Sequence, residues 1–163
     1  MHKNFIKISF FFILILTVNG CSGVSSKQEL IDRAGAPLLS GLGNHSHEIT
    51  SSEDGVQEYF DQGLILAFAF NHAESVRSFK AAQRLDPNCA MAWWGIAYCL
   101  SSNYNWAPGL GSGHDAIQQA LSVMGHCTEL EQDLIQALST RHSAEARDAA
   151  DPSVLNMGNS PEL

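Results

Sequence analysis

The sequence predicts an all-helical protein, and two observations support that fold class. Apolar residues recur at three- and four-residue steps over most of residues 56–142. This spacing places side chains on one face of an α-helix. Turn signals such as Asn71-His72 and Asp86-Pro87 divide the pattern into helix-length pieces;. With 163 residues, the chain has room for one domain and some flanking sequence;.

The first twenty residues have the pattern of a secretion signal. His2, Lys3 and Lys7 form a basic start, and residues 8–18 are almost purely apolar but short for crossing a bilayer;. The following Val-Asn-Gly-Cys sequence resembles the lipobox of bacterial lipoproteins, although Asn19 is an imperfect match. That resemblance implies cleavage after residues 1–20, a lipid on Cys21 and a membrane-anchored protein in the cell envelope, facing the periplasm or the cell exterior. An ordinary signal peptide and an uncleaved anchor are the alternatives.

Residues 21–52 change in composition toward serine, glycine and other polar residues, with Pro37 among them. Only residues 28–34 carry a short helical pattern. We expect this stretch to be a polar tether that holds the folded part away from the membrane.

Residues 53–88 predict a pair of helices. Ser51 and Ser52 are expected to cap the first helix, and its apolar positions begin at Val56;. The second helix is expected to end at Asp86-Pro87, because proline cannot continue into a helix interior. One face of the second helix carries the apolar residues Val76, Phe79, Ala82 and Leu85.

Residues 89–127 predict a second pair with a long connection. A helix is expected over 90–101, and the helical pattern resumes at Asp115 after the stretch SSNYNWAPGLGSG. Residues 128–150 begin a partial third unit, in which Thr128 and Glu131 form a capping box. The apolar positions of that fifth helix are Leu130, Leu134, Ala137 and Leu138, and residues 151–163 are expected to be a disordered tail;.

Three residues of the first helix reappear in the third at one separation. Tyr59 corresponds to Trp93, Gly63 to Ala97 and Leu66 to Leu100, each 34 residues apart. A 34-residue period of helix-turn-helix units resembles the tetratricopeptide repeat (TPR) family. The resemblance implies antiparallel helix pairs stacked as a short solenoid, packed through Tyr59, Gly63, Leu66, Phe79, Ala82, Pro87, Trp93, Ile96, Ala97 and Leu100. Ser75 departs from the alanine that the family usually has.

The amino-acid sequence of residues 41–106 is similar to that of a subgroup of exported bacterial TPR proteins. Members of this subgroup are generally longer and have no established biochemical activity. About three repeats are needed for a stable stack, so we expect either a truncated chain or a last helix that serves as a cap. The resemblance implies a protein–protein interaction module rather than an enzyme. A non-catalytic fragment of a longer TPR protein is the related alternative, and an enzyme whose catalytic part lies in a continuation of the chain is another.

The expected partner surface follows from the same phasing. In stacked repeats, the first helix of each pair lines a concave face that binds a protein or peptide. The residues on that face are Gln57, Phe60, Leu64, Phe68, Met91, Trp94 and Tyr98. The alternative is that they are buried against further helices.

Other chemistries have weaker signals. Seventeen acidic and nine basic residues give a net charge of −8, which argues against nucleic acid as a partner;. The chain has no C-x-x-C motif, and Cys89, Cys99 and Cys127 are expected to be buried thiols, with a weak alternative of a Cys99–Cys127 disulfide;. No cofactor is expected. A zinc or copper site using His45, His47 and His72 is the competing hypothesis, because imidazole is a common metal ligand.

Overall fold

The structure is a computed structural model that describes residues 27–101 and 110–142. Within these ranges it is all-helical and has no strand, which confirms the predicted fold class. The elements are α1 (Lys27–Ala34), α2 (Val56–Phe68), α3 (His72–Leu85), α4 (Ala90–Cys99), α5 (Leu110–Val123), the 3-10 turn η1 (Met124–His126) and α6 (Glu129–Arg141). The expected signal peptide, Cys21 and the expected tail at 151–163 lie outside the described residues.

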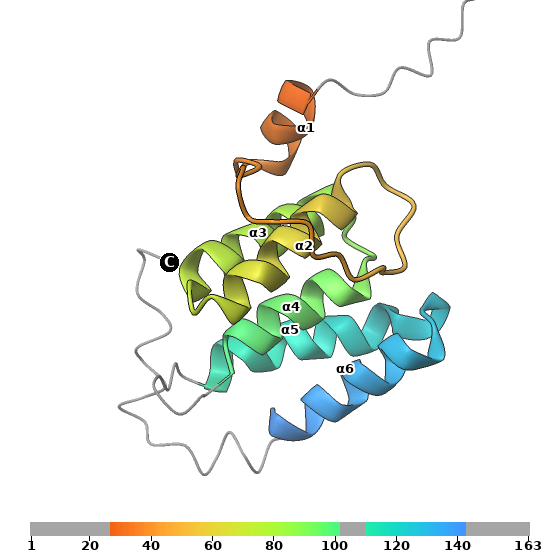
Figure 1. Cartoon of the computed structure of the whole chain (residues 1–163). Helices are drawn as coiled ribbons and strands as arrows, with labels where there is room; N and C mark the ends of the chain where they lie inside the picture. The colour runs from red at the N-terminus through yellow and green to blue at the C-terminus, as the bar shows by residue number, and fades with distance from the viewer. Residues whose placement is uncertain (1–26, 102–109, 143–163) are drawn as a thin grey trace, which may run out of the picture.

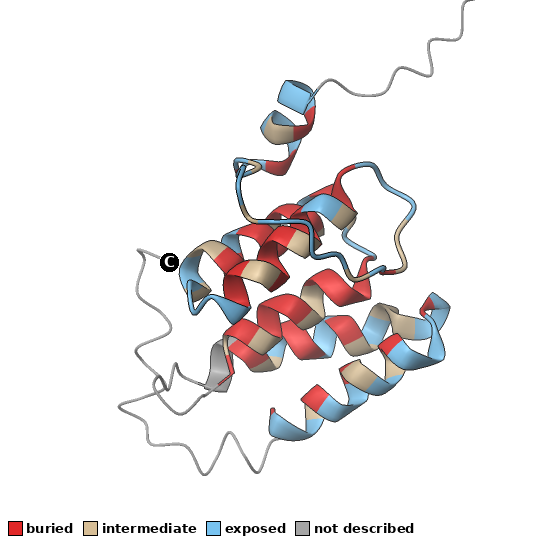
Figure 2. Cartoon of the chain, viewed as in Figure 1, coloured by how far each residue is buried: buried red, intermediate tan, exposed pale blue. Residues whose placement is uncertain are grey.

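Neighbouring helices pack in chain order (Figure 1). Helix α4 lies between α3 on one side and α5 on the other, and α6 covers α5 and part of α4. Buried residues concentrate on α2, α3 and α4, whereas α6 is exposed along most of its length (Figure 2). The core therefore follows the stacking direction of the helices, and α6 is its outermost described layer.

The start of α2 differs from the expected serine cap. The N-cap residue is Gly55, at φ 86°, and no side chain caps the helix. Only glycine adopts this left-handed conformation without strain, and a Cβ at Gly55 would also lie 2.3 Å from Leu30;. Ser51 instead donates a hydrogen bond to Asp86 at 2.8 Å. The predicted end of α3 is confirmed, since the helix stops at Leu85, immediately before Asp86-Pro87;.

Phe79 is the centre of contact among α2, α3 and α4. Its ring is fully buried and lies 5.4 Å from the ring of Phe60. A Cβ at Gly63 on α2 would come within 2.8 Å of this ring, and one at Gly95 on α4 within 2.4 Å. The close approach expected at Gly63 is present, and Gly95 provides a second one that the sequence did not indicate.

One boundary and one buried face in the second half of the chain differ from the prediction. Helix α5 begins at Leu110, five residues before Asp115, so the inter-helix connection is shorter than expected. The Thr128–Glu131 capping box of α6 is confirmed. The buried face of α6 is nevertheless rotated from the predicted one, because Ile135 and Leu138 are buried while Leu130 is 61% exposed.

The segment expected to be a free tether is packed against the helices where the structure describes it. Residues 28–34 are helical, as predicted, within α1. The following segment runs beside α2 (Figure 1), and Ala36 and Ile49 are buried. The tether prediction is therefore wrong for residues 27–52. Composition alone did not reveal the hydrogen bonds that hold this segment.

Candidate functional site

The residues predicted to line an open groove do not form one surface. Phe60, Leu64 and Met91 are buried, at 0%, 7% and 1% exposure. Gln57, Trp94 and Tyr98 are half-buried. Phe68 is 65% exposed. A partner cannot reach the three buried residues without opening the helical core, so the expected groove is largely interior.

Trp94 explains why the α4 part of this set is interior. Its indole N–H donates to the Leu134 carbonyl of α6 at 3.1 Å. Its ring stacks on Tyr98, with centroids 5.2 Å apart. The hydrogen bond joins α4 to α6, which matches the alternative of burial against a further helix.

The repeat-packing residues are mostly interior as well. Tyr59, Leu66, Phe79, Ala82, Ile96 and Ala97 are buried, and Gly63 contacts the core as described above. Trp93 and Leu100 are half-buried, and Pro87 is exposed at the turn after α3. The Trp93 indole donates to the Pro87 carbonyl at 2.9 Å, which joins the start of α4 to that turn.

The α2 part of the predicted groove is covered by the chain itself. We call residues 36–50 the strap. The His47 ring of the strap lies 6.4 Å from the Phe60 ring, centroid to centroid. Gln57 accepts a hydrogen bond from the Ile49 backbone N–H at 3.1 Å. The face of α2 that was expected to bind a partner is therefore occupied by the strap.

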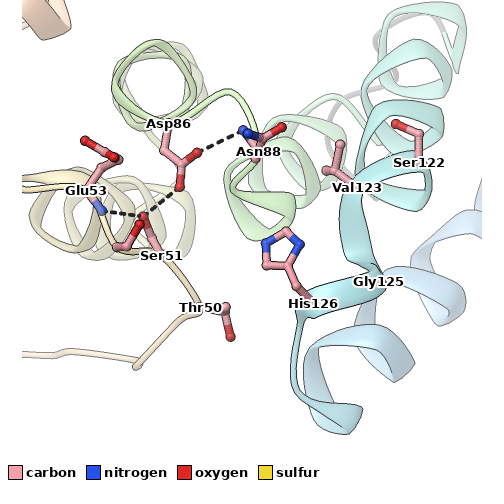
Figure 3. A pocket seen from close by; sticks show the side chains of 10 residues that line it. Thr50, Ser51, Glu53, Asp86, Asn88, Ser122, Val123, Gly125 and His126 are labelled. Carbon is pink, nitrogen blue, oxygen red and sulfur yellow. Dashed lines mark hydrogen bonds between the residues drawn. The ribbon is translucent and has the colours of Figure 1, made fainter.

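An open cleft of about 820 Å³ lies where three separate parts of the chain meet (Figure 3). One wall is the end of the strap and the residues that follow it, the second is the turn between α3 and α4, and the third is the end of α5 with η1. The lining residues are Thr50, Ser51, Ser52, Glu53, Asp86, Asn88, Ser122, Val123, Gly125 and His126. Eight of these ten residues carry polar side chains, so the cleft offers hydrogen-bonding groups along most of its lining.

Asp86 organises the polar groups of the cleft. Its carboxylate accepts the Ser51 hydroxyl at 2.8 Å and the Asn88 backbone N–H at 2.9 Å. The Ser51 oxygen in turn accepts the Glu53 backbone N–H at 3.3 Å (Figure 3). The lining includes the carboxylates of Glu53 and Asp86 and the imidazole of His126, but no lysine or arginine. The cleft therefore favours a ligand with cationic or hydrogen-bond-donating groups.

Glu131 fixes the strap at the edge of this cleft. The carboxylate accepts the Thr50 backbone N–H at 2.7 Å and the Thr50 hydroxyl at 2.6 Å. It also accepts the backbone N–H and the hydroxyl of Thr128, both at 2.8 Å. Burial by itself would raise the pKa of Glu131, but the hydrogen bonds from Thr50 and Thr128 lower it overall;. One charged side chain therefore caps α6 and anchors a segment 81 residues away.

The three described cysteines are free and buried. Cys99 lies beside the Ser75 hydroxyl, with the sulfur and oxygen 3.0 Å apart. The weaker expectation of a Cys99–Cys127 disulfide is therefore wrong. Burial raises the pKa of Cys89 to about 11 and that of Cys99 to about 11;. Thiols with such pKa values are weak nucleophiles at neutral pH.

The candidate metal ligands are dispersed. His45 is exposed, His47 lies against Phe60, and His72 begins α3 with its ring 6.1 Å from the Phe70 ring. Across residues 27–101 and 110–142, no group of three histidine, cysteine, aspartate or glutamate residues is arranged to hold a metal ion. No observation favours the zinc or copper hypothesis.

The sequence did not indicate the cleft or the strap contacts, although Gln57 was in the predicted groove and Ser51 and Ser52 were predicted as caps. Gln62 gave the clearest available signal, because it is a polar residue between Tyr59 and Gly63 on a buried helix face, and it is only 7% exposed. Glu131 was recognised as a capping residue, but no local sequence signal indicates its contact with Thr50.

No described helix is long and apolar enough to cross a membrane.

No family model matches the chain, and no curated protein and no solved structure matches it either.

Proposed function

We propose that the chain is an exported, lipid-anchored TPR module that binds a protein partner in the cell envelope. The lipobox-like sequence before Cys21 supports export and lipidation;. The 34-residue correspondence between α2 and α4 supports the TPR assignment, together with the close approach of helices at Gly63;. Chain-order packing of α2 to α5 is compatible with stacked helix pairs.

The partner site that we propose is the cleft, rather than the groove expected from sequence. The observation that supports this choice is the open, polar hollow bounded by Ser51, Asp86 and His126. Its size suits a peptide segment or a loop of a partner. Glu53 and Asp86 contribute carboxylates, and the lining has no basic side chain. The bound segment of the partner therefore carries a lysine or an arginine.

Site-specific photocrosslinking in the producing cells tests this proposal. A photoreactive amino acid replaces Ser122, which is exposed at the cleft wall, or Thr140, which is exposed near the end of α6. The two positions are matched, because each hydroxyl donates to the carbonyl three residues earlier in its helix. We expect a discrete protein adduct from position 122 that is absent at position 140. The added change Glu53→Gln should weaken that adduct.

Identical adducts from both positions, or no adduct from position 122, would contradict the cleft assignment. The anchor is tested separately by labelling cells with palmitate. The wild-type chain is expected to take up the label and Cys21→Ala to lose it. An unlabelled wild-type chain would exclude a lipoprotein.

A further inference from the structure

The strap is held mainly through its backbone. Gln62 accepts the Leu39 N–H at 2.7 Å and donates to the Pro37 carbonyl at 3.1 Å. Gln57 likewise accepts the Ile49 N–H at 3.1 Å and donates to the His47 carbonyl at 2.8 Å. Each glutamine amide thus presents one acceptor and one donor to the strap, as a neighbouring strand would.

Two carboxylates complete this arrangement. Asp61 accepts the His47 N–H at 3.0 Å, and Glu131 accepts the Thr50 N–H at 2.7 Å. In a helical domain the helix backbones have already used their own hydrogen-bonding groups. An extended segment can therefore be held only by side chains of this kind, and Gln57, Asp61 and Glu131 supply them from two helices.

Side chains near the end of the strap add to the backbone contacts. Ile49 is buried, and the Thr50 hydroxyl donates to Glu131 at 2.6 Å. The Ser46 hydroxyl donates to Asp61 at 2.7 Å, and the His47 ring lies 6.4 Å from the Phe60 ring. Leu39 is 43% exposed, and residues 43–46 are exposed. Over residues 46–50 the helices thus contact the backbone together with two hydroxyls, one imidazole and the buried apolar side chain of Ile49, which directly precedes Thr50.

We propose that this face of α2 and α6 is a receptor for extended peptide segments and that the strap occupies it as a self-ligand. The competing occupant is an extended partner segment with a β-branched apolar residue followed by threonine or serine, which would replace residues 47–50. This proposal rests on the proposed function, because it assumes that the module binds a protein. It adds a second site, next to the cleft, whose access the chain itself controls.

A labelled synthetic peptide of residues 45–52, with both ends blocked, tests the proposal in solution with the full chain. The covalently attached strap has a high effective concentration, so the wild-type chain should exclude the peptide. The variant Ile49→Gly/Thr50→Gly removes the Ile49 and Thr50 side-chain contacts of the strap and leaves the side chains of α2 and α6 unchanged. We expect it to bind the peptide about tenfold more tightly than wild type, as measured by fluorescence anisotropy.

Two further variants, each added to the Ile49→Gly/Thr50→Gly chain, distinguish specific recognition of the peptide from non-specific binding. Gln57→Ala removes the amide that hydrogen-bonds to the backbone at positions 47 and 49. It should reduce peptide binding about tenfold. Gln136→Ala, on the exposed side of α6, should leave binding unchanged. Equal binding by the wild-type and weakened-strap chains, or by the Gln57→Ala and Gln136→Ala variants, would overturn the proposal.

The single variant Thr50→Gly is the milder alternative if the double variant loses its helical circular dichroism. Loss of helicity in both variants would show that the strap is an integral part of the fold and not an exchangeable ligand, which also overturns the proposal. The crosslinking experiment at Ser122 probes a different wall of the molecule in cells. A negative result for the self-ligand proposal can therefore be distinguished from a negative result for the proposed function.

Discussion

Replacing Gly95 by alanine tests the packing of the helical core most directly. The new Cβ would lie 2.4 to 2.6 Å from three ring carbons of Phe79. Carbon atoms pack best at about 3.5–4.0 Å, so the ring and α4 must separate by about 1 Å. Phe79 has little room to withdraw, because it is fully buried with the Phe60 ring 5.4 Å away and Gly63 on its α2 side.

The magnitude follows from two opposing effects. Overpacking a core costs about 1–3 kcal/mol, whereas glycine to alanine in a helix interior stabilises by about 1 kcal/mol. Because the clash involves three atoms of a confined ring, we place the overpacking cost at the upper end. Gly95→Ala should therefore lower the free energy of unfolding by about 2 kcal/mol net, which corresponds to a melting temperature lower by about 4–8 °C.

Urea denaturation of the full chain, followed by circular dichroism, measures this effect. The second change Phe79→Leu should create room for the new methyl group, so the double variant should lose less stability than the sum of the single changes, by about 1 kcal/mol. Gly125→Ala is the control, because no atom lies within 4 Å of a Cβ there. Unchanged stability of Gly95→Ala, or additive single effects, would refute the packing described around Phe79.

Three other predictions concern the strap anchor, the thiols and the α4–α6 contact. The pKa of Glu131 is lowered in the folded state, so its stabilising contribution is present above the unfolded pKa and is lost as pH falls through the folded pKa;. Glu131→Gln should flatten the acid decline of the melting temperature, and an identical pH profile would contradict this role. Cys89 and Cys99, with pKa values of about 11, should react with iodoacetamide far more slowly in the folded chain than in urea, and faster as pH rises toward 11;. Fast labelling at pH 7 would show that they are accessible. Trp94→Ala should destabilise the fold by about 3 kcal/mol, because it removes the stacking on Tyr98 and the bond to α6;. Phe68→Ala, at an exposed position of the same predicted groove, should change stability by less than about 0.5 kcal/mol in parallel melts, and equal effects would place Trp94 outside the core;.

The sequence by itself determined the features that depend on neighbours in the chain. Pro87 stops α3 because its ring cannot enter a helix, and Thr128 and Glu131 start α6 because they satisfy helix N–H groups three residues apart;. The periodicity of α2 and α3 predicted that Tyr59 and Phe79 face the core;. These signals are local, so they can be identified in the sequence without knowledge of the fold.

Only the tertiary structure decided which polar and apolar residues meet across the chain. A polar composition suggested that residues 27–52 are free, yet Gln57, Gln62 and Glu131 hold that segment, because its backbone groups find partners on helices far away in sequence. The face of α6 that is buried likewise depended on how α4 and α5 present their surfaces, and this exposed Leu130 while burying Ile135. Helical spacing fixes which residues share a face, but the choice between two amphipathic faces is made by the packing surface, which the local sequence does not encode.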